Sequence, residues 1–127
     1  MAQDVNGEPV RVVVVDDQEV FRSVLREVIA ATPGMALVGE AASGEQALQA
    51  VDELAPQLVI MDKRMSGMGG IEASRRIRDR HPQIVVVLAS VEDPTPEVLA
   101  ASAATTVVHK RELSPAVLMD VWRDRVT

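Results

Sequence analysis

Short apolar runs recur along the chain at intervals of about 25 residues, and several of them are continuous rather than alternating. Continuous runs rich in Val and Ile are typical of strands that are buried on both faces, as in a parallel sheet covered by helices. We therefore predict five buried strands. Their sequences are VRVVVV at 10–15, MALVGEA at 35–41, LVIM at 58–61, IVVVLA at 84–89 and TVVH at 106–109.

Each apolar run is followed by a helical pattern with its own start or stop signals. In the first pattern Phe21, Leu25 and Val28 share one face. The start signals of the later helices are Ser43 with Gln46 in a capping box, Pro96 in a first turn, and Ser114 followed by Pro115. The stop signals are TPG at 32–34 and Pro82.

The order of elements is therefore strand then helix, five times over. This order predicts an α/β fold, a doubly wound five-stranded parallel sheet with right-handed crossovers, strand order 2-1-3-4-5 and a flavodoxin-like arrangement of five helices. We expect residues 10–127 to form one domain, and residues 1–9 to be a flexible N-terminal tail.

Composition narrows the function without defining it. The chain of 127 residues has no Cys, which excludes disulfides, thiol catalysis and Cys-type zinc sites. The formal net charge of -6 argues against direct binding of nucleic acid through bulk charge. The first ten residues are polar and acidic, unlike a secretory signal, and no apolar run is long enough to span a membrane. We therefore expect a cytoplasmic protein without a membrane partner.

Polar side chains follow four of the predicted strands. Asp16 and Asp17 end the first run, Asp62 the third, Ser90 the fourth and Lys110 the fifth. In the predicted strand order these residues meet in one crevice at the carboxyl edge of the sheet. Two carboxylates about 4 Å apart repel each other by roughly 4 kcal/mol at an effective dielectric constant near 20. A divalent cation removes this cost, and oxygen-only ligands suit Mg²⁺. One carboxylate is then free to attack phosphorus and form an acyl phosphate.

Four stretches together resemble the response-regulator receiver domain of two-component signalling. They are VVVVDDQEVFRSVL, LVIMDKRMSGMGGIEA, IVVVLAS and VVHK, and the resemblance extends over the chain from Val10 onward. It implies that Asp62 is the phosphoacceptor. It further implies that Mg²⁺ is bound directly by Asp17, Asp62 and the backbone carbonyl of Arg64, and through water by Asp16.

The resemblance also implies roles for the remaining residues and for partners. Ser90 would hydrogen-bond the phosphoryl group after transfer, and Lys110 would pair with one of its oxygens. The donor would be a phosphohistidine on a histidine kinase or phosphotransfer protein, and a downstream protein, unknown from the sequence, would read the result. The protein would be a signalling switch rather than an enzyme, catalysing only its own phosphorylation and dephosphorylation. A homodimer could form through the face of the fourth helix, fifth strand and fifth helix.

The stretches GEAASGEQALQAV and GGIEASRRIR resemble receivers that usually precede a helix-turn-helix output domain. The sequence ends at DVWRDRVT without linker-like composition, so we expect a stand-alone receiver. The fifth helix also carries Trp122, which fits either the core or an interface equally well. The arginines of the third helix predict a solvated basic face: Arg75, Arg76, Arg78 and Arg80.

Several positions depart from the family pattern. Ser66 replaces a proline and predicts a looser loop, Val91 replaces a small residue and predicts narrower access to Asp62, and Arg111 replaces the proline after the lysine. Val107 stands where the family often has an aromatic residue, which puts the usual output switch in doubt.

Two variable positions flank the predicted site, and they carry opposite charges. We expect Arg64 and Glu92 to pair across the site and to slow the attack of water on the phosphorylated form.

Two alternatives remain open at this point. A receiver-like interaction module that works without phosphorylation is suggested by Val107, Val91 and Ser66. A Mg²⁺-dependent phosphohydrolase with an Asp nucleophile is disfavoured, because no second carboxylate lies two residues after Asp62 to act as acid or base.

Overall fold

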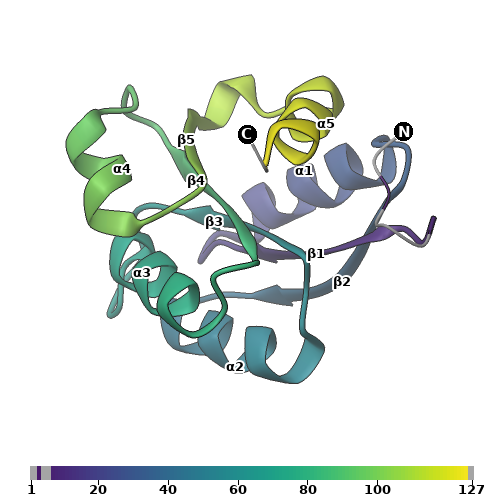
Figure 1. Cartoon of the computed structure of the whole chain (residues 1–127). Helices are drawn as coiled ribbons and strands as arrows, with labels where there is room; N and C mark the ends of the chain where they lie inside the picture. Colours follow the sequence, from purple (N-terminus) through teal and green to yellow (C-terminus); the bar gives the residue numbers. More distant parts are fainter. Residues whose placement is uncertain (1–2, 4–6, 126–127) are drawn as a thin grey trace.

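The computed structural model describes residues 3 and 7–125 and contains the predicted five-stranded parallel sheet in the order β2-β1-β3-β4-β5 (Figure 1). The strands are β1 (Val10–Val15), β2 (Met35–Ala41), β3 (Leu58–Asp62), β4 (Val85–Ser90) and β5 (Thr106–His109). The helices are α1 (Glu19–Ala30), α2 (Gly44–Leu54), α3 (Gly70–Arg80), α4 (Pro96–Ser102) and α5 (Pro115–Asp124), with a short 3-10 helix η1 (Lys110–Glu112) after β5. The fold class is confirmed, whereas most of the expected tail over residues 1–9 lies outside the described residues.

The helices form two layers that bury both faces of the sheet. Helices α1 and α5 cover one face, and α2 and α3 cover the other (Figure 1). Alternate valines of β1 divide between the two cores, with Val12 and Val14 in the first and Val13 and Val15 in the second. Burial on both faces explains why this strand is a continuous apolar run rather than an alternating one.

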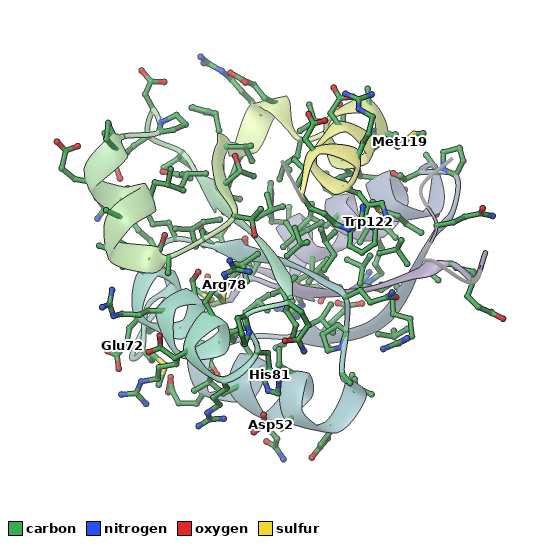
Figure 2. The ribbon with its side chains drawn as sticks, in the orientation of Figure 1. Asp52, Glu72, Arg78, His81, Met119 and Trp122 are labelled. Carbon is green, nitrogen blue, oxygen red and sulfur yellow. The ribbon has the colours of Figure 1, made fainter. Side chains whose placement is uncertain are left out.

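Trp122 belongs to the core, which decides between the two alternatives that the sequence leaves open. Its side chain packs with the α1–α5 core, and the residue is only 7% exposed (Figure 2). The indole Nε1–H donates a hydrogen bond of 3.0 Å to the carbonyl of Gln3. A buried tryptophan with a satisfied N–H anchors α5 against the sheet.

The predicted capping signals are present, with one difference in the capping box. The Ser43 hydroxyl accepts a hydrogen bond of 3.1 Å from the N–H of Gln46, and the Ser114 hydroxyl accepts one of 3.2 Å from Val117. The Gln46 side chain accepts from the N–H of Ala42, one residue before the helix cap, and not from the cap itself. Both helices therefore begin where the sequence predicts.

The expectation of a solvated basic face on α3 is wrong for Arg78. Its guanidinium is partly buried and donates hydrogen bonds to the carbonyls of Pro82, Ile84 and Ala103 (Figure 2). These carbonyls come from the segments that follow α3 and α4, so Arg78 ties the two connections together. The other three arginines of this face are exposed: Arg75, Arg76 and Arg80.

Substitution of Ser74 tests the packing between α3 and its neighbours. Ser74 is fully buried, and its hydroxyl has no hydrogen-bond partner among the described residues. A buried unsatisfied hydroxyl costs free energy, so we expect Ser74→Ala to raise the free energy of unfolding by about 1 kcal/mol in urea titrations followed by circular dichroism.

The matched control is Ser102→Ala, which removes a buried hydroxyl that does have partners. The Ser102 hydroxyl donates to the carbonyl of Leu99 at 3.3 Å and accepts from the N–H of Ala104 at 3.2 Å. Its loss leaves a buried N–H unpaired and is expected to lower the free energy of unfolding by about 1–2 kcal/mol. Equal destabilisation by both substitutions would show that the Ser74 hydroxyl is satisfied after all.

Candidate functional site

The polar residues predicted to meet do gather at the carboxyl edge of the sheet. Asp16 follows β1 directly, Asp62 and Ser90 are the last residues of β3 and β4, and Lys110 follows β5. Asp16 and Ser90 are 0% and 2% exposed and Asp62 is 8% exposed, whereas Asp17 is exposed to solvent. The site is therefore a buried acidic floor with one carboxylate at its solvent side.

The carboxylates of Asp16, Asp17 and Asp62 lie close enough to share one cation. Each offers an oxygen, and the three oxygens lie within 4.8 Å of one another. Hard oxygen ligands with room for water or phosphoryl oxygens fit Mg²⁺. These residues therefore fit Mg²⁺, while the predicted contribution of the Arg64 carbonyl stays a prediction.

Lys110 bridges two of these carboxylates. Its Nζ lies 2.9 Å from Oδ2 of Asp16 and 3.3 Å from Oδ1 of Asp62. The same ammonium lies 4.1 Å from the centre of the Phe21 ring, which is a favourable cation–π distance. The sequence placed Phe21 only in the apolar stripe of the first helix, because nothing in the chain order indicates which charge lies over its ring.

Burial makes the ionised form of Asp62 costly. Desolvation raises the pKa of this carboxyl above its usual value, and the neighbouring charge of Asp16 raises it further. Lys110 and the backbone N–H of Arg64, which lies 3.4 Å from Oδ1, lower the pKa and only partly compensate. A bound cation would favour the ionised form that a nucleophile needs.

The expected pair between Arg64 and Glu92 is present and includes a third residue. The Arg64 guanidinium donates to Oε1 of Glu92 at 2.7 and 3.0 Å, and Lys63 Nζ lies 2.7 Å from the same oxygen. The hydrogen bonds from Lys63 and then Arg64 hold the pKa of Glu92 at about 2. The pairing is confirmed, and Lys63 is a partner that the sequence analysis missed.

This charge cluster continues into the site through Ser90. The Ser90 hydroxyl accepts a hydrogen bond of 3.0 Å from the N–H of Glu92. Its own proton stays available, because a hydroxyl donates and accepts at the same time. Ser90 is thus placed at the end of β4 as predicted, while its role toward a phosphoryl group stays a prediction.

The loop between β3 and α3 leads to Gly70, the first residue of α3, which lies directly against the backbone of Asp62. A Cβ added to Gly70 would lie 2.0 Å from the carbonyl oxygen of Asp62, so only glycine fits there. The loop is also tied to α2, because Oε1 of Glu45 accepts a hydrogen bond of 3.1 Å from the N–H of Met68. This tie is present although Ser66 replaces the family's proline.

The turn after β5 contains Arg111, where the resemblance leads one to expect a proline. The His109 ring caps η1, since its Nδ1 accepts a hydrogen bond of 3.2 Å from the N–H of Arg111. This bond requires that Nδ1 carries no proton. Arg111 therefore supplies an N–H that the usual proline lacks.

Comparison with known proteins agrees with this geometry. The family model described as the response regulator receiver domain matches residues 12–121. The chain therefore belongs to the response-regulator receiver domains, which are the signalling switches of two-component systems.

Individual relatives extend the comparison. The response regulator GacA of Pseudomonas viridiflava is 44% identical over 103 residues, which cover 80% of this chain and 48% of the relative. Protein-glutamate methylesterase/protein-glutamine glutaminase 4 of Myxococcus xanthus is 35% identical over 111 residues, which cover 86% of this chain and 31% of the relative. The chain thus spans about half the length of GacA and less of the methylesterase.

Among solved structures, the response regulator domain of CheB from Thermotoga maritima superposes with a TM-score of 0.81. The two chains are 28% identical, and the match covers 94% of this chain and 98% of the CheB domain. In the part of the chain that the structure describes, no helix is both long enough and apolar enough to cross a membrane.

The raised pKa of Asp62 predicts a pH-dependent effect of Asp62→Asn in the absence of Mg²⁺. An acid whose folded-state pKa is raised contributes stability below its unfolded pKa and loses it as the pH rises through the folded-state pKa. Asp62→Asn removes this loss, so we expect it to stabilise the protein at neutral pH and to have a smaller effect near about pH 4.

Urea titrations of both proteins across this pH range, with EDTA present, measure the difference. Added Mg²⁺ should reduce the advantage of the variant, because the cation stabilises the parent's ionised carboxylates. A difference in stability that did not change with pH would contradict the assigned cause.

Proposed function

We propose that this chain is a phosphoacceptor receiver in which Asp62 accepts a phosphoryl group from a phosphohistidine of a histidine kinase or phosphotransfer protein. The observation that carries the proposal is the arrangement of Asp16, Asp17 and Asp62 within 4.8 Å, with Lys110 in contact with two of them. An acidic cluster of this kind, with two carboxylates buried and one at the solvent side, fits Mg²⁺ and a phosphoryl group together.

The chain's own residues divide the chemistry. When bound, Mg²⁺ would neutralise the carboxylates and the oxygens of the incoming phosphoryl group. An Asp62 oxygen attacks phosphorus, the P–O bond forms as the P–N bond of the phosphohistidine breaks, and the electron pair returns to the imidazole. Lys110 then exchanges a carboxylate for a phosphoryl oxygen, and the Ser90 hydroxyl donates to another.

The outcome of this chemistry is a change in a protein-interaction surface. In this proposal the protein is a cytoplasmic switch, catalyses only its own phosphorylation and dephosphorylation, and makes no direct contact with nucleic acid. Phosphorylation shifts the balance between two conformations that both exist beforehand. The surface formed by α4, β5 and α5 is the proposed site of the downstream partner or of homodimerisation, and Val107 lies on it, paired with Leu88 of β4.

The first test is the intact mass of the protein after incubation with acetyl phosphate and Mg²⁺. We expect one phosphoryl adduct on the parent and none on Asp62→Asn, because the acceptor oxygen is lost while the side-chain size is kept. EDTA should abolish the adduct on the parent. The matched control is Asp79→Asn, since Asp79 is an exposed aspartate on α3 and should leave the adduct unchanged.

A parent without an adduct would then be incubated with autophosphorylated histidine kinases. Transfer from a kinase would keep the proposal and show that the site excludes small donors, as Val91 suggests. Failure with acetyl phosphate and with every kinase would favour the interaction module that works without phosphorylation. Turnover of a simple phosphate monoester would instead favour the phosphohydrolase.

Removal of the Glu92 carboxylate, which pairs with Lys63 and Arg64, should shorten the lifetime of the phosphorylated form. Glu92 holds Lys63 and Arg64 beside Asp62, and we propose that this arrangement slows the approach of water. We expect Glu92→Ala to speed dephosphorylation about threefold or more, which corresponds to roughly 0.6 kcal/mol in the barrier. Decay of the phosphoprotein by mass spectrometry or phosphate-gel electrophoresis measures the rate.

Glu97→Ala on α4 is the control, because Glu97 is exposed and lies outside this cluster. The stability of Glu92→Ala should change little, since Glu92 is half exposed and exposed ion pairs contribute only about 0–1 kcal/mol. An unchanged rate of dephosphorylation would rule out the proposed role.

A further inference from the structure

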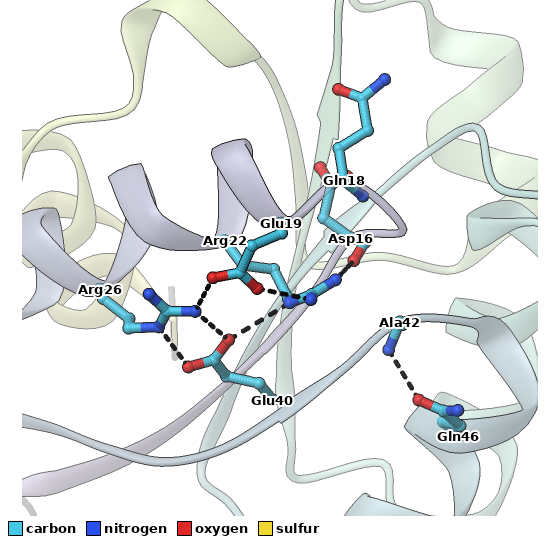
Figure 3. A network of polar contacts seen from close by, with 8 residues as sticks. All are labelled: Asp16, Gln18, Glu19, Arg22, Arg26, Glu40, Ala42 and Gln46. Carbon is cyan, nitrogen blue, oxygen red and sulfur yellow. Dashed lines mark hydrogen bonds and ion pairs between the residues drawn. The ribbon is translucent and has the colours of Figure 1, made fainter.

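A cluster of four charged side chains lies beside the acidic site, between α1 and the edge strand β2. It consists of Arg22 and Arg26 with Glu19 and Glu40 (Figure 3). The Arg22 guanidinium lies 2.6 Å from a Glu19 oxygen and 3.3 Å from a Glu40 oxygen. Its side chain is only 16% exposed, so the planar group is held in one orientation by carboxylates on two different elements.

Among the described residues, Arg22 is the member of this cluster that contacts the acidic site. Nη1 of Arg22 donates a hydrogen bond of 2.6 Å to the backbone carbonyl of Asp16 (Figure 3). Arg26 binds the same two glutamates, yet the structure gives it no bond to Asp16 among the described residues. The cluster therefore contains a natural pair for comparison: one arginine with the contact and one without it.

The contact completes the hydrogen bonding of Asp16. The carboxylate of Asp16 accepts from the N–H of Gln18 at 2.9 Å and from Lys110 at 2.9 Å, and its own N–H donates to Ala41 at 3.1 Å. With Arg22 on the carbonyl, every polar atom of this fully buried residue has a partner. Asp16 is thus a rigid point at the end of β1.

The orientation of Asp17 depends on that rigid point. The carbonyl of Asp16 and the N–H of Asp17 belong to the same planar peptide unit, so a bond to the carbonyl fixes the direction in which the chain enters Asp17. Asp17 is exposed, and within the described residues the structure gives its carboxylate no hydrogen bond. The position of this carboxylate next to Asp16 and Asp62 is therefore set by the backbone rather than by partners of its own.

The glutamates explain why a positive side chain is tolerated so close to a cation site. An unpaired arginine would repel a divalent cation, whereas Arg22 is neutralised locally by Glu19 and Glu40. It can then act on the site through geometry alone. Groups that orient metal ligands in this way typically change metal affinity by about 10–100-fold when they are removed.

We propose that Arg22 is a positioning residue for the metal site, which holds the Asp16–Asp17 peptide so that Asp17 presents its carboxylate to the cation. This inference rests on the proposed function only in that the acidic cluster binds Mg²⁺. Glu19 and Glu40 serve it by orienting and neutralising the guanidinium.

The test is a Mg²⁺ titration of the metal-free protein, followed by calorimetry and by backbone amide NMR shifts. Arg22→Gln should raise the Kd for Mg²⁺ about tenfold, because the Asp17 carboxylate is no longer held toward the site. Arg26→Gln removes a second arginine from the same two glutamates, but it removes no contact with Asp16. It should therefore leave the Kd within about twofold of the parent. The amide signals of Asp17 and Gln18 in the metal-free protein should shift in Arg22→Gln and not in Arg26→Gln.

Arg22→Lys separates geometry from charge and guards against a variant that fails to fold. A single ammonium keeps the charge, yet it cannot reach the carbonyl and two carboxylates as the guanidinium does. We therefore expect weakened binding for Arg22→Lys as well. Urea titrations of each variant establish that the change in affinity occurs in folded protein.

The outcomes distinguish this inference from the proposed function. Mg²⁺ binding by Arg22→Gln as tight as by the parent, or tighter, overturns the positioning role, since removal of a cation acting only through its charge would tighten binding. Equal weakening in Arg26→Gln also overturns it, because the effect would then belong to the charge cluster as a whole. A parent that binds no Mg²⁺ overturns the proposed function itself.

Discussion

Lys110 lies 2.9 Å from the carboxylate of Asp16 and 3.3 Å from that of Asp62, and the site depends on these two contacts. Both carboxylates are buried at the ends of adjacent strands, where two like charges would repel and neither is fully hydrated. The single positive charge of Lys110 offsets part of the repulsion between the two carboxylates. The remaining negative charge is what makes the pocket suitable for a divalent cation.

The parallel sheet produces this concentration of charge. Parallel strands place all their carboxyl ends at one edge, and the order β2-β1-β3-β4-β5 puts β1, β3, β4 and β5 side by side. Residues that are far apart in the chain, such as Asp16 and Lys110, therefore become neighbours. The burial of both faces of the central strands keeps the backbone beneath them rigid, so the geometry of the site is set by the core.

Two further clusters of charge flank the pocket and act on different strands. Lys63, Arg64 and Glu92 join the ends of β3 and β4, while Arg22 with its glutamate partners holds the end of β1. The two arginines at β1 are balanced by two glutamates, whereas Lys63 and Arg64 share the single carboxylate of Glu92. The balanced cluster at β1 can therefore shape the pocket without repelling a bound cation.

The sequence by itself determined the fold, the strand order and the residues of the acidic pocket. Continuous apolar runs have few other ways to be buried, and strand ends in a parallel sheet must share an edge. It also predicted the pair of Arg64 and Glu92, because these two positions flank the site. Only the tertiary structure decided that Lys63 joins this pair, that Arg22 binds the carbonyl of Asp16, and that Phe21, Arg78 and Trp122 have the partners they do. These contacts depend on side-chain direction and on neighbours from distant segments, and no pattern along the chain encodes those.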